Sequence, residues 1–131
     1  MASTIVRQLL IHEGITLSIP VTICGRTLNA ILDTGAERTL INEKWVPVLG
    51  LKLLDKFPID VKGALSDCVN SAQETVLSLR IGDTNFPHTA LSTEIGDDLL
   101  LGADFMAAHK CVIDLGYHCF APHYSPSRSS E

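Results

Sequence analysis

One short stretch of the chain carries residue types that could do acid–base chemistry. Asp33, Thr34 and Gly35 follow the apolar run 30–32 and precede Ala36. A carboxylate beside a buried strand is costly unless it accepts hydrogen bonds or shares a proton with another acid. The glycine allows a tight turn, and the threonine hydroxyl can supply a hydrogen bond. The stretch therefore predicts a carboxylate held for proton transfer, although the same residue types also suit an ordinary β-turn.

Short apolar segments separated by turn residues surround this stretch. They lie at 15–19, 21–23, 28–32, 59–61, 76–81, 89–91, 99–101 and 111–113. Such spacing is typical of an all-β domain. Two stretches are predicted to be short helices: 42–49, with Asn42 as its N-cap and Gly50 beyond its end, and 104–110. The strand that ends at the Asp-Thr-Gly has a counterpart in the second half, so we expect two related halves.

Length and charge exclude several other kinds of protein. At 131 residues, the chain fits one domain that can bury a core without disulfides or a structural metal. The 10 lysines and arginines against 15 aspartates and glutamates give a net charge of -5, so nucleic acid is not an expected partner. No apolar stretch approaches the about 20 residues of a membrane span, and no signal peptide is visible. We therefore expect a cytoplasmic protein without a membrane partner.

The cysteines and histidines raise the question of a metal site. The cysteines are Cys24, Cys68, Cys111 and Cys119. They form no Cys-x-x-Cys pair and are expected to remain free thiols in the core. The segment 109–123 holds three histidines and two cysteines, but their spacing does not match that of known zinc sites. We expect neither a metal nor another cofactor.

The Asp-Thr-Gly stretch resembles the active-site signature of the aspartic proteases. Its continuation at 37–41 resembles the retropepsin branch, the proteases of retroviruses and long-terminal-repeat retrotransposons. The second signature of that branch is an apolar strand, a glycine and a short helix, and residues 99–106 match it. The Gly-Ala-Asp-Phe at 102–105 is most similar to the retrotransposon members. Together the matching segments extend from 15 to 116, which makes the resemblance far more specific than a lone motif.

The resemblance implies an all-β acid-protease fold, a closed β-barrel-like monomer with one short helix after the second half, active as a symmetric homodimer. In this family two aspartates share a proton and a water to cleave peptide bonds, here in extended apolar polypeptide segments. The stretches 83–85 and 114–116 lack a complete Asp-Thr-Gly, so the second aspartate must come from another chain. The resemblance further implies processing of a retroelement polyprotein, in the cytoplasm or inside a virus-like particle. The alternative is a dimerisation or peptide-binding domain with little or no activity.

The resemblance also assigns roles to single residues. Asp33, Thr34 and Gly35 would be catalytic, with Thr34 bonding across the twofold axis and the Gly35 N–H directed at the carboxylates. The substrate would contact apolar walls, cleft backbone and the tip of a flap hairpin, at Ile31, Ala36, Glu37, Leu40, Gly63, Ala64 and Leu100. The flap, at 59–69, lacks the glycine-rich tip of its relatives.

Three further residues would support the site: Thr39, Gly102 and Asp104. Asp104 would reach back to hydrogen-bond Thr39, or it would act only as a carboxylate at a helix N-terminus. The domain organisation is expected to be simple. Residues 1–10 are a candidate dimer-interface strand, 11–120 are the protease-like domain, and 121–131 form a Ser/Pro-rich tail that is expected to be flexible.

Overall fold

The computed structural model describes residues 2–3, 9–11, 16–54, 59–62 and 69–124. The strands are β1 (Ala2–Ser3), β2 (Leu10–Ile11), β3 (Leu17–Ile23), β4 (Arg26–Leu32), β5 (Leu40–Asn42), β6 (Ile59–Lys62), β7 (Val69–Ile81), β8 (Thr84–Thr93), β9 (Leu99–Leu101), β10 (Val112–Asp114), β11 (Cys119–Ala121) and β12 (His123–Tyr124). The helices are α1 (Trp45–Leu49) and α2 (Ala103–Ala108). The predicted all-β class is confirmed.

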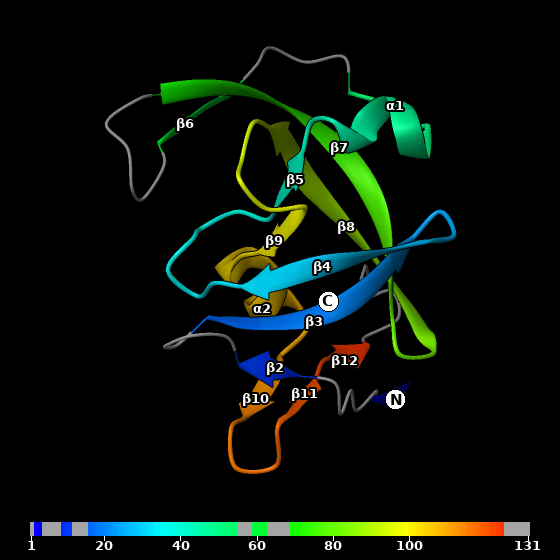
Figure 1. The fold of residues 1–131 in the computed structure, drawn as a ribbon, viewed down its shortest axis with the longest axis vertical. Coiled ribbons are helices and arrows are strands. Elements are labelled where there is room, and N and C mark those ends of the chain that lie inside the picture. Colours follow the sequence, from blue (N-terminus) through cyan, green and yellow to red (C-terminus); the bar gives the residue numbers. More distant parts are fainter. Residues whose placement is uncertain (1, 4–8, 12–15, 55–58, 63–68, 125–131) are drawn as a thin grey trace, which may run out of the picture.

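Six strands close into a barrel in the order β3-β4-β9-β5-β8-β7 (Figure 1). The ring closes where β7 pairs with β3 at Thr22 and Arg80. β2 and β6 extend the sheet beyond the ring, next to β3 and β7 respectively. Two pairs of adjacent strands, β4–β9 and β5–β8, are parallel, and the other pairs in the ring are antiparallel. The closed barrel that the resemblance implies is therefore present.

The alternation of residues along the strands explains the barrel core. Every second residue of β4 from Leu28 to Leu32 is buried, while Asn29 between them is exposed. The hairpin turn that joins β3 to β4 has positive φ at Cys24 (51°) and Gly25 (83°), as tight two-residue turns require. Cys24 is exposed there, so the expectation that all cysteines lie in the core is wrong for this residue. Cys68 lies outside the described residues.

Helix α1 begins later than the sequence predicts. The expected helix covers 42–49 with Asn42 as N-cap, but Asn42 ends strand β5 and the N-cap is Lys44. The Asn42 N–H donates to the carbonyl of Asp98 (2.9 Å), and this tertiary bond keeps the residue in the strand. The end is as predicted, since Gly50 forms the C-cap with a positive φ of 67°.

Helix α2 lies at the end of the second half, as the resemblance implies. It spans Ala103–Ala108 rather than the expected 104–110, and Phe105 anchors it in the core with no exposed surface. No helix in the described ranges has the length and apolar character needed to cross a lipid bilayer.

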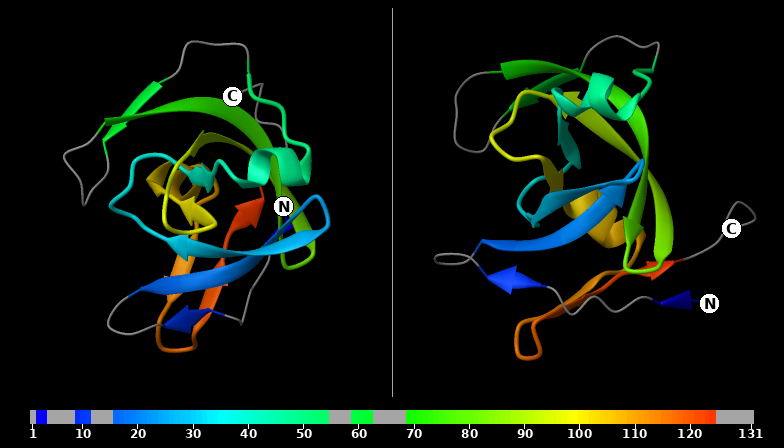
Figure 2. Two further views of the ribbon diagram at one scale, coloured as in Figure 1. Left: turned by 45° about the horizontal axis from the view of Figure 1, so that its top comes forward. Right: turned by 45° about the vertical axis from the view of Figure 1, so that its right-hand side comes forward.

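Two small sheets lie beside the barrel (Figure 2). The hairpin β10–β11 forms one of them. The other joins the two ends of the chain, because β1 pairs with β12 in the register Ala2 opposite Tyr124. Residues 121–124 of the expected tail thus contribute to strands, and 125–131 lie outside the described residues.

Candidate active site

The Asp-Thr-Gly stretch forms a turn directly after β4, in the loop at the left of Figure 1. The Asp33 N–H donates to the carbonyl of Leu101 (3.0 Å), which ties the turn to β9. The Ala36 N–H donates to the Asp33 carbonyl (3.2 Å) and closes the turn. The Gly35 N–H donates to Asp33 Oδ1 (2.9 Å), so the carboxylate is held by the backbone beneath it. The stretch is a turn, and the turn also orients a half-buried carboxylate.

A second group of contacts fixes the far end of this loop. Asp104 Oδ2 accepts the Thr39 N–H (3.1 Å), and its Oδ1 accepts the Thr39 hydroxyl (2.8 Å). Thr39 is fully buried, and its hydroxyl oxygen in turn accepts the Gly102 N–H (3.2 Å). Asp104 Oδ1 also accepts the Phe105 N–H (2.7 Å) at the start of α2. Asp104 therefore has both arrangements considered for it, the reach back to Thr39 and the place at the helix start.

Gly102 lets the loop and α2 approach closely. A Cβ atom at this position would lie 2.6 Å from the Arg38 carbonyl oxygen and 2.8 Å from that of Ala36. The Ala103 N–H donates to the Ala36 carbonyl (2.7 Å), and the Asp104 N–H donates to that of Glu37 (3.2 Å). The carbonyls of two residues expected to contact substrate are thus engaged by α2.

The three apolar residues expected to contact substrate lie side by side on neighbouring strands. Ile31 of β4 is in register with Leu100 of β9, which is in register with Leu40 of β5. All three are half-buried, whereas their strand neighbours Leu99 and Leu101 are fully buried in the core. They therefore share the face that points away from the core. Gly63 and Ala64, the expected flap contacts, lie outside the described residues.

The other aspartates considered in the sequence lie at hairpins, Asp83 in a turn and Asp114 at the end of a strand. Asp83 lies between β7 and β8, where its Oδ1 accepts the Thr84 hydroxyl (3.2 Å). Asp114 lies at the end of β10, and its Oδ1 accepts the Tyr117 N–H (3.0 Å). Neither aspartate lies on the loop that follows β4. One chain therefore supplies one Asp-Thr-Gly carboxylate.

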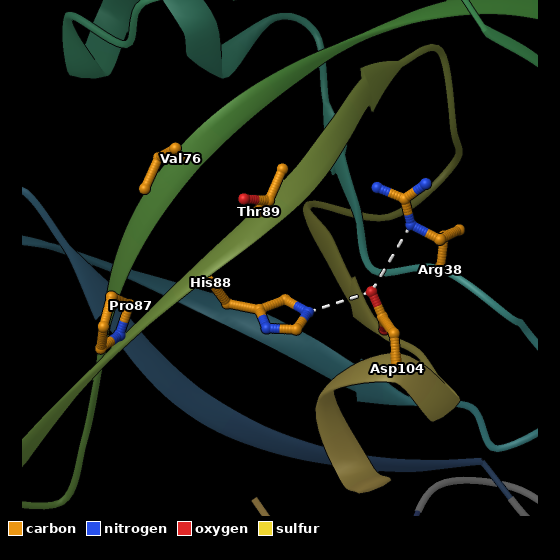
Figure 3. Close-up of a pocket in the computed structure, with 6 residues that line it drawn as sticks. All are labelled: Arg38, Val76, Pro87, His88, Thr89 and Asp104. Atoms are coloured by element: carbon orange, nitrogen blue, oxygen red, sulfur yellow. Dashed lines mark hydrogen bonds and ion pairs between the residues drawn. The ribbon is translucent and has the colours of Figure 1, made fainter. Parts of the chain in front are cut away.

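A charged cluster next to Thr39 was not predicted from the sequence. His88 Nε2 lies 3.0 Å from Asp104 Oδ2, and Arg38 Nε lies 3.7 Å from the same oxygen (Figure 3). Arg38 also pairs with Glu74 (3.3 Å). Next to the cluster is an open cavity of about 470 Å³, which is lined by Arg38, Val76, Pro87, His88, Thr89 and Asp104. One feature of the sequence could have indicated this cluster. His88 alternates with the inward-facing Phe86 and Ala90 along β8, so a polar residue stands at an inward-facing position.

The contacts of Asp104 determine its charge. Burial raises the pKa of this carboxyl, but hydrogen bonds from His88 and Thr39 outweigh the burial, and the net pKa is lowered from 3.8. The carboxylate is therefore ionised when it holds the loop. Among the described residues, no three histidines, cysteines or acids cluster as a metal site would require.

Comparisons with known proteins bear on this arrangement. A profile of the family described as aspartyl protease matches residues 19–105. The retroviral protease-like domain of Ddi1 from Leishmania major superposes with a TM-score of 0.66 at 18% identity, covering 86% of this chain and 96% of that chain. The EIAV protease in complex with the inhibitor HBY-793 gives 0.65 at 17% identity, with 81% and 99% covered.

A third solved structure, a retropepsin-like aspartic protease from Rickettsia conorii, gives a TM-score of 0.66 at 21% identity and covers 94% of this chain and 91% of that chain. A search of curated proteins finds no match. At these identities the structural matches show a shared fold.

Proposed function

Because the chain belongs to the aspartyl protease family, we propose that it is an aspartic endopeptidase that works as a symmetric homodimer. Its retropepsin fold, which the sequence resemblance predicts, is shared with a viral protease and a bacterial retropepsin-like protease. The activity and the dimer go beyond that shared fold. They rest on the geometry of Asp33.

The observation that carries the proposal is that one chain supplies one of the two carboxylates of the catalytic pair, which is a half site. The half-buried residue Asp33 is held on a hydrogen-bonded turn, whereas Asp83 and Asp114 lie at the β7–β8 and β10–β11 hairpins. Hydrolysis by this chemistry needs two close carboxylates that share one proton. A second chain related by a twofold axis supplies Asp33 again, and the two turns together complete the pair.

The completed pair divides the work between a base and an acid. The ionised carboxylate takes a proton from the attacking water, whose oxygen bonds to the carbonyl carbon, while the other carboxyl protonates the carbonyl oxygen. The first carboxyl then gives its proton to the amide nitrogen as the carbon–nitrogen bond breaks, and the other carboxylate takes a proton from a hydroxyl of the diol, which restores the starting pair. The Gly35 N–H keeps Asp33 oriented through both steps, because it donates to Oδ1. Thr34 of each chain would brace the two turns against each other.

The proposed substrate is an extended polypeptide with apolar side chains. The face formed by Ile31, Leu40 and Leu100 offers an apolar wall across β4, β5 and β9. The loop at 33–39, here called the catalytic loop, joins β4 to β5. The β6–β7 hairpin is in the sequence position of the family's flap. The Gly-Ala-Asp-Phe at 102–105 supports a retroelement polyprotein as the protein that is processed, in the cytoplasm or inside a particle.

The dimer can use strands that are left open in one chain. The β1–β12 sheet and the β10–β11 sheet each have two strands, and their outer edges pair with no other described strand. An open edge can accept a strand from a second copy of the chain. The N-terminal segment therefore remains a candidate for the dimer interface, with β12 as its partner within one chain.

A second candidate function is a dimerisation or peptide-binding domain without efficient catalysis. It is favoured by the flap sequence, which has a single glycine at 63 followed by Ala-Leu-Ser-Asp. The similarity to the retroviral protease-like domain of Ddi1 also favours it, since that name describes a fold rather than an activity.

The test is Asp33→Asn. Asparagine keeps an oxygen that can accept the Gly35 N–H, so the turn and the fold should persist, but the amide can neither share a proton nor activate water. We expect kcat/KM on an apolar peptide library to fall about 10³-fold or more. The matched control is Asp83→Asn, which changes an aspartate in a hairpin turn and should leave cleavage unchanged.

Two outcomes would decide between the functions. Cleavage that is blocked by an aspartic-protease inhibitor and lost in Asp33→Asn supports the endopeptidase. Peptide binding without cleavage in the unmodified chain supports the second candidate. Cleavage that survives in Asp33→Asn would contradict the catalytic role of this residue.

A further inference from the structure

The β10–β11 hairpin carries large apolar side chains on the outside of the molecule. Val112 is 52% exposed, Leu115 55% and Tyr117 78%. The other strongly exposed large apolar residues are spread over four separate segments, at Ile11, Val48, Leu53 and Val76. Apolar side chains that are gathered in one place mark an interaction site, whereas scattered ones are ordinary. The hairpin is therefore the part of the described surface that most needs a partner.

One face of the hairpin packs on the barrel, and the other faces away from it. Phe120 is fully buried, and Ile113, its partner in the β10–β11 register, packs against the core. Val112 precedes Ile113 in β10, so its side chain lies on the opposite face of the hairpin. The outer edges of β10 and β11 pair with no other described strand. A partner can therefore contact both the apolar face and the backbone groups of an open edge.

The low charge of the hairpin suits a partner that is itself acidic. Each chain has a net charge of -5, so two copies repel one another and meet most easily where fixed charges are few. Asp114 is the only Asp, Glu, Lys or Arg between 111 and 121. Its Oδ1 already accepts the Tyr117 N–H (3.0 Å). The apolar face can thus be covered by a second copy of the chain without bringing many like charges together.

The hairpin also lies on the side of the molecule where the second copy is needed. In both views of Figure 2 the tip of the β10–β11 hairpin and the catalytic loop lie toward the left of the barrel. A twofold axis that brings two Asp33 carboxylates together passes beside the catalytic loop. Surfaces on that side of the barrel therefore face the second copy.

We infer that the outer face of the β10–β11 hairpin, with Val112, Leu115 and Tyr117, is the surface on which a second copy of this chain docks. The inference rests on the proposed function, which needs a second Asp33, and it names the surface that brings this residue into place. The twofold axis makes the contact self-complementary, so the two hairpins meet each other. Strand β1 is already paired with β12 within one chain, and this contact does not require it.

The test places a charge in the apolar face. In Val112→Lys the twofold axis brings two like charges together, so the dissociation constant of the dimer, measured by analytical ultracentrifugation, should rise at least about 100-fold. The matched control is Val48→Lys, because Val48 is 53% exposed but lies in α1, and this change should leave the constant unaltered. An unaltered constant in Val112→Lys, or an equal rise in both variants, would overturn the inference and leave the face to another occupant.

A mixing experiment separates a broken interface from a broken fold. Val112→Lys and Val112→Asp should each be monomeric at a concentration where the unmodified chain is dimeric. A mixture of the two should form a heterodimer, because opposite charges then meet across the axis. Misfolded variants could not be rescued in this way. A mixture that stays monomeric, although both variants keep the circular dichroism spectrum of the unmodified chain, would contradict contact between the two hairpins.

Removal of residues 1–3 tests a contact through the ends of the chain instead. Because β1 pairs with β12 of its own chain, this deletion should leave the dissociation constant of the dimer unaltered. A rise as large as that expected for Val112→Lys would transfer the interface from the hairpin to the terminal strands.

Association is measured without any cleavage, so the interface and the proposed function can fail separately. If Val112→Lys breaks the dimer but the unmodified chain cleaves no peptide, the proposed function fails and the interface stands. If the unmodified dimer cleaves peptides and Val112→Lys alters neither association nor cleavage, the interface alone fails. A chain that is monomeric at every concentration would overturn the interface, and cleavage by that monomer would overturn the shared site as well.

Discussion

The thiols of Cys24 and Cys111 occupy opposite environments. Cys24 is exposed in the β3–β4 turn, whereas burial raises the pKa of Cys111 from 9.0 to about 12. A rise of three units lowers the thiolate fraction about a thousandfold at neutral pH, and the thiolate is the reactive form. Near pH 8, iodoacetamide should therefore modify Cys24 in the folded protein and spare Cys111, with mass spectrometry as the measurement.

The control for this prediction is the unfolded chain. In a Cys68→Ser/Cys119→Ser background, denaturant should make Cys24 and Cys111 react at similar rates. Equal rates in the folded protein would show that Cys111 is more accessible than its surroundings suggest.

At the residue scale, the sequence predicts the groups that form a local pattern. Asp33, Thr34 and Gly35 are adjacent in the chain, so their types alone indicate a held carboxylate. The role of His88 could not be predicted in this way, because its contact with Asp104 depends on how β8 packs against α2. An inward-facing histidine in a strand indicates a polar partner but not which partner.

At the element scale, the junction of β9 with α2 supports the catalytic loop. Replacing Gly102 by alanine would place a Cβ 2.6 Å from the Arg38 carbonyl oxygen, and this neighbour is backbone that cannot rotate away. We expect Gly102→Ala to lower the free energy of unfolding by about 1–3 kcal/mol and to reduce kcat/KM by separating α2 from the loop. Chemical denaturation and peptide cleavage measure the two effects.

Gly96→Ala is the matched control for this substitution. A Cβ at Gly96 meets no atom within 4 Å, so the same chemical change should leave stability within about 1 kcal/mol of the unmodified protein. A Gly102→Ala variant as stable and active as Gly96→Ala would mean that the loop and α2 can separate without loss.

Helix boundaries show where local pattern stops being informative. Gly50 ends α1 as predicted, because glycine adopts the positive φ of a helix C-cap without a steric clash, whatever its tertiary contacts. Asn42 fails as the N-cap, because its backbone bonds to Asp98, which is far along the chain. Strands β4 and β9 lie in the apolar segments 28–32 and 99–101 that the sequence predicts. Strand β5 was not predicted, and the closure of β7 onto β3 required the whole barrel.

At the scale of the whole molecule, His109 should make the fold sensitive to acid. Its ring packs on Phe105 (4.5 Å between centroids) and on Phe86 (5.1 Å), and its buried Nδ1 has no hydrogen-bond partner among the described residues. Burial and then the His88 charge lower its pKa from 6.5 in the folded state. The stability that neutral His109 contributes is therefore present above pH 6.5 and is lost as the pH falls through its lowered pKa.

The measurement is the free energy of unfolding at several pH values for His88→Gln and for His88→Gln/His109→Phe. The shared His88→Gln background removes the charge of His88 from the comparison. The contribution of Asp104, whose pKa is lowered from 3.8, is lost only in stronger acid. Between pH 6.5 and about 4, the His109→Phe protein should lose less stability. Parallel losses would show that His109 accepts a proton in the fold without penalty.

The half site also makes activity depend on concentration. A chain that supplies one Asp33 should be inactive alone, so activity per milligram should fall on dilution as the dimer dissociates by mass action. A tandem chain, in which a flexible linker joins the end of one copy to the start of the next, should keep its activity, because the linker raises the effective concentration. Changing Asp33 to asparagine in only one copy of the tandem should then abolish cleavage, since the shared proton needs both carboxyls. Half the activity in that protein, or constant activity in dilute single chains that sediment as monomers, would show that one Asp33 suffices.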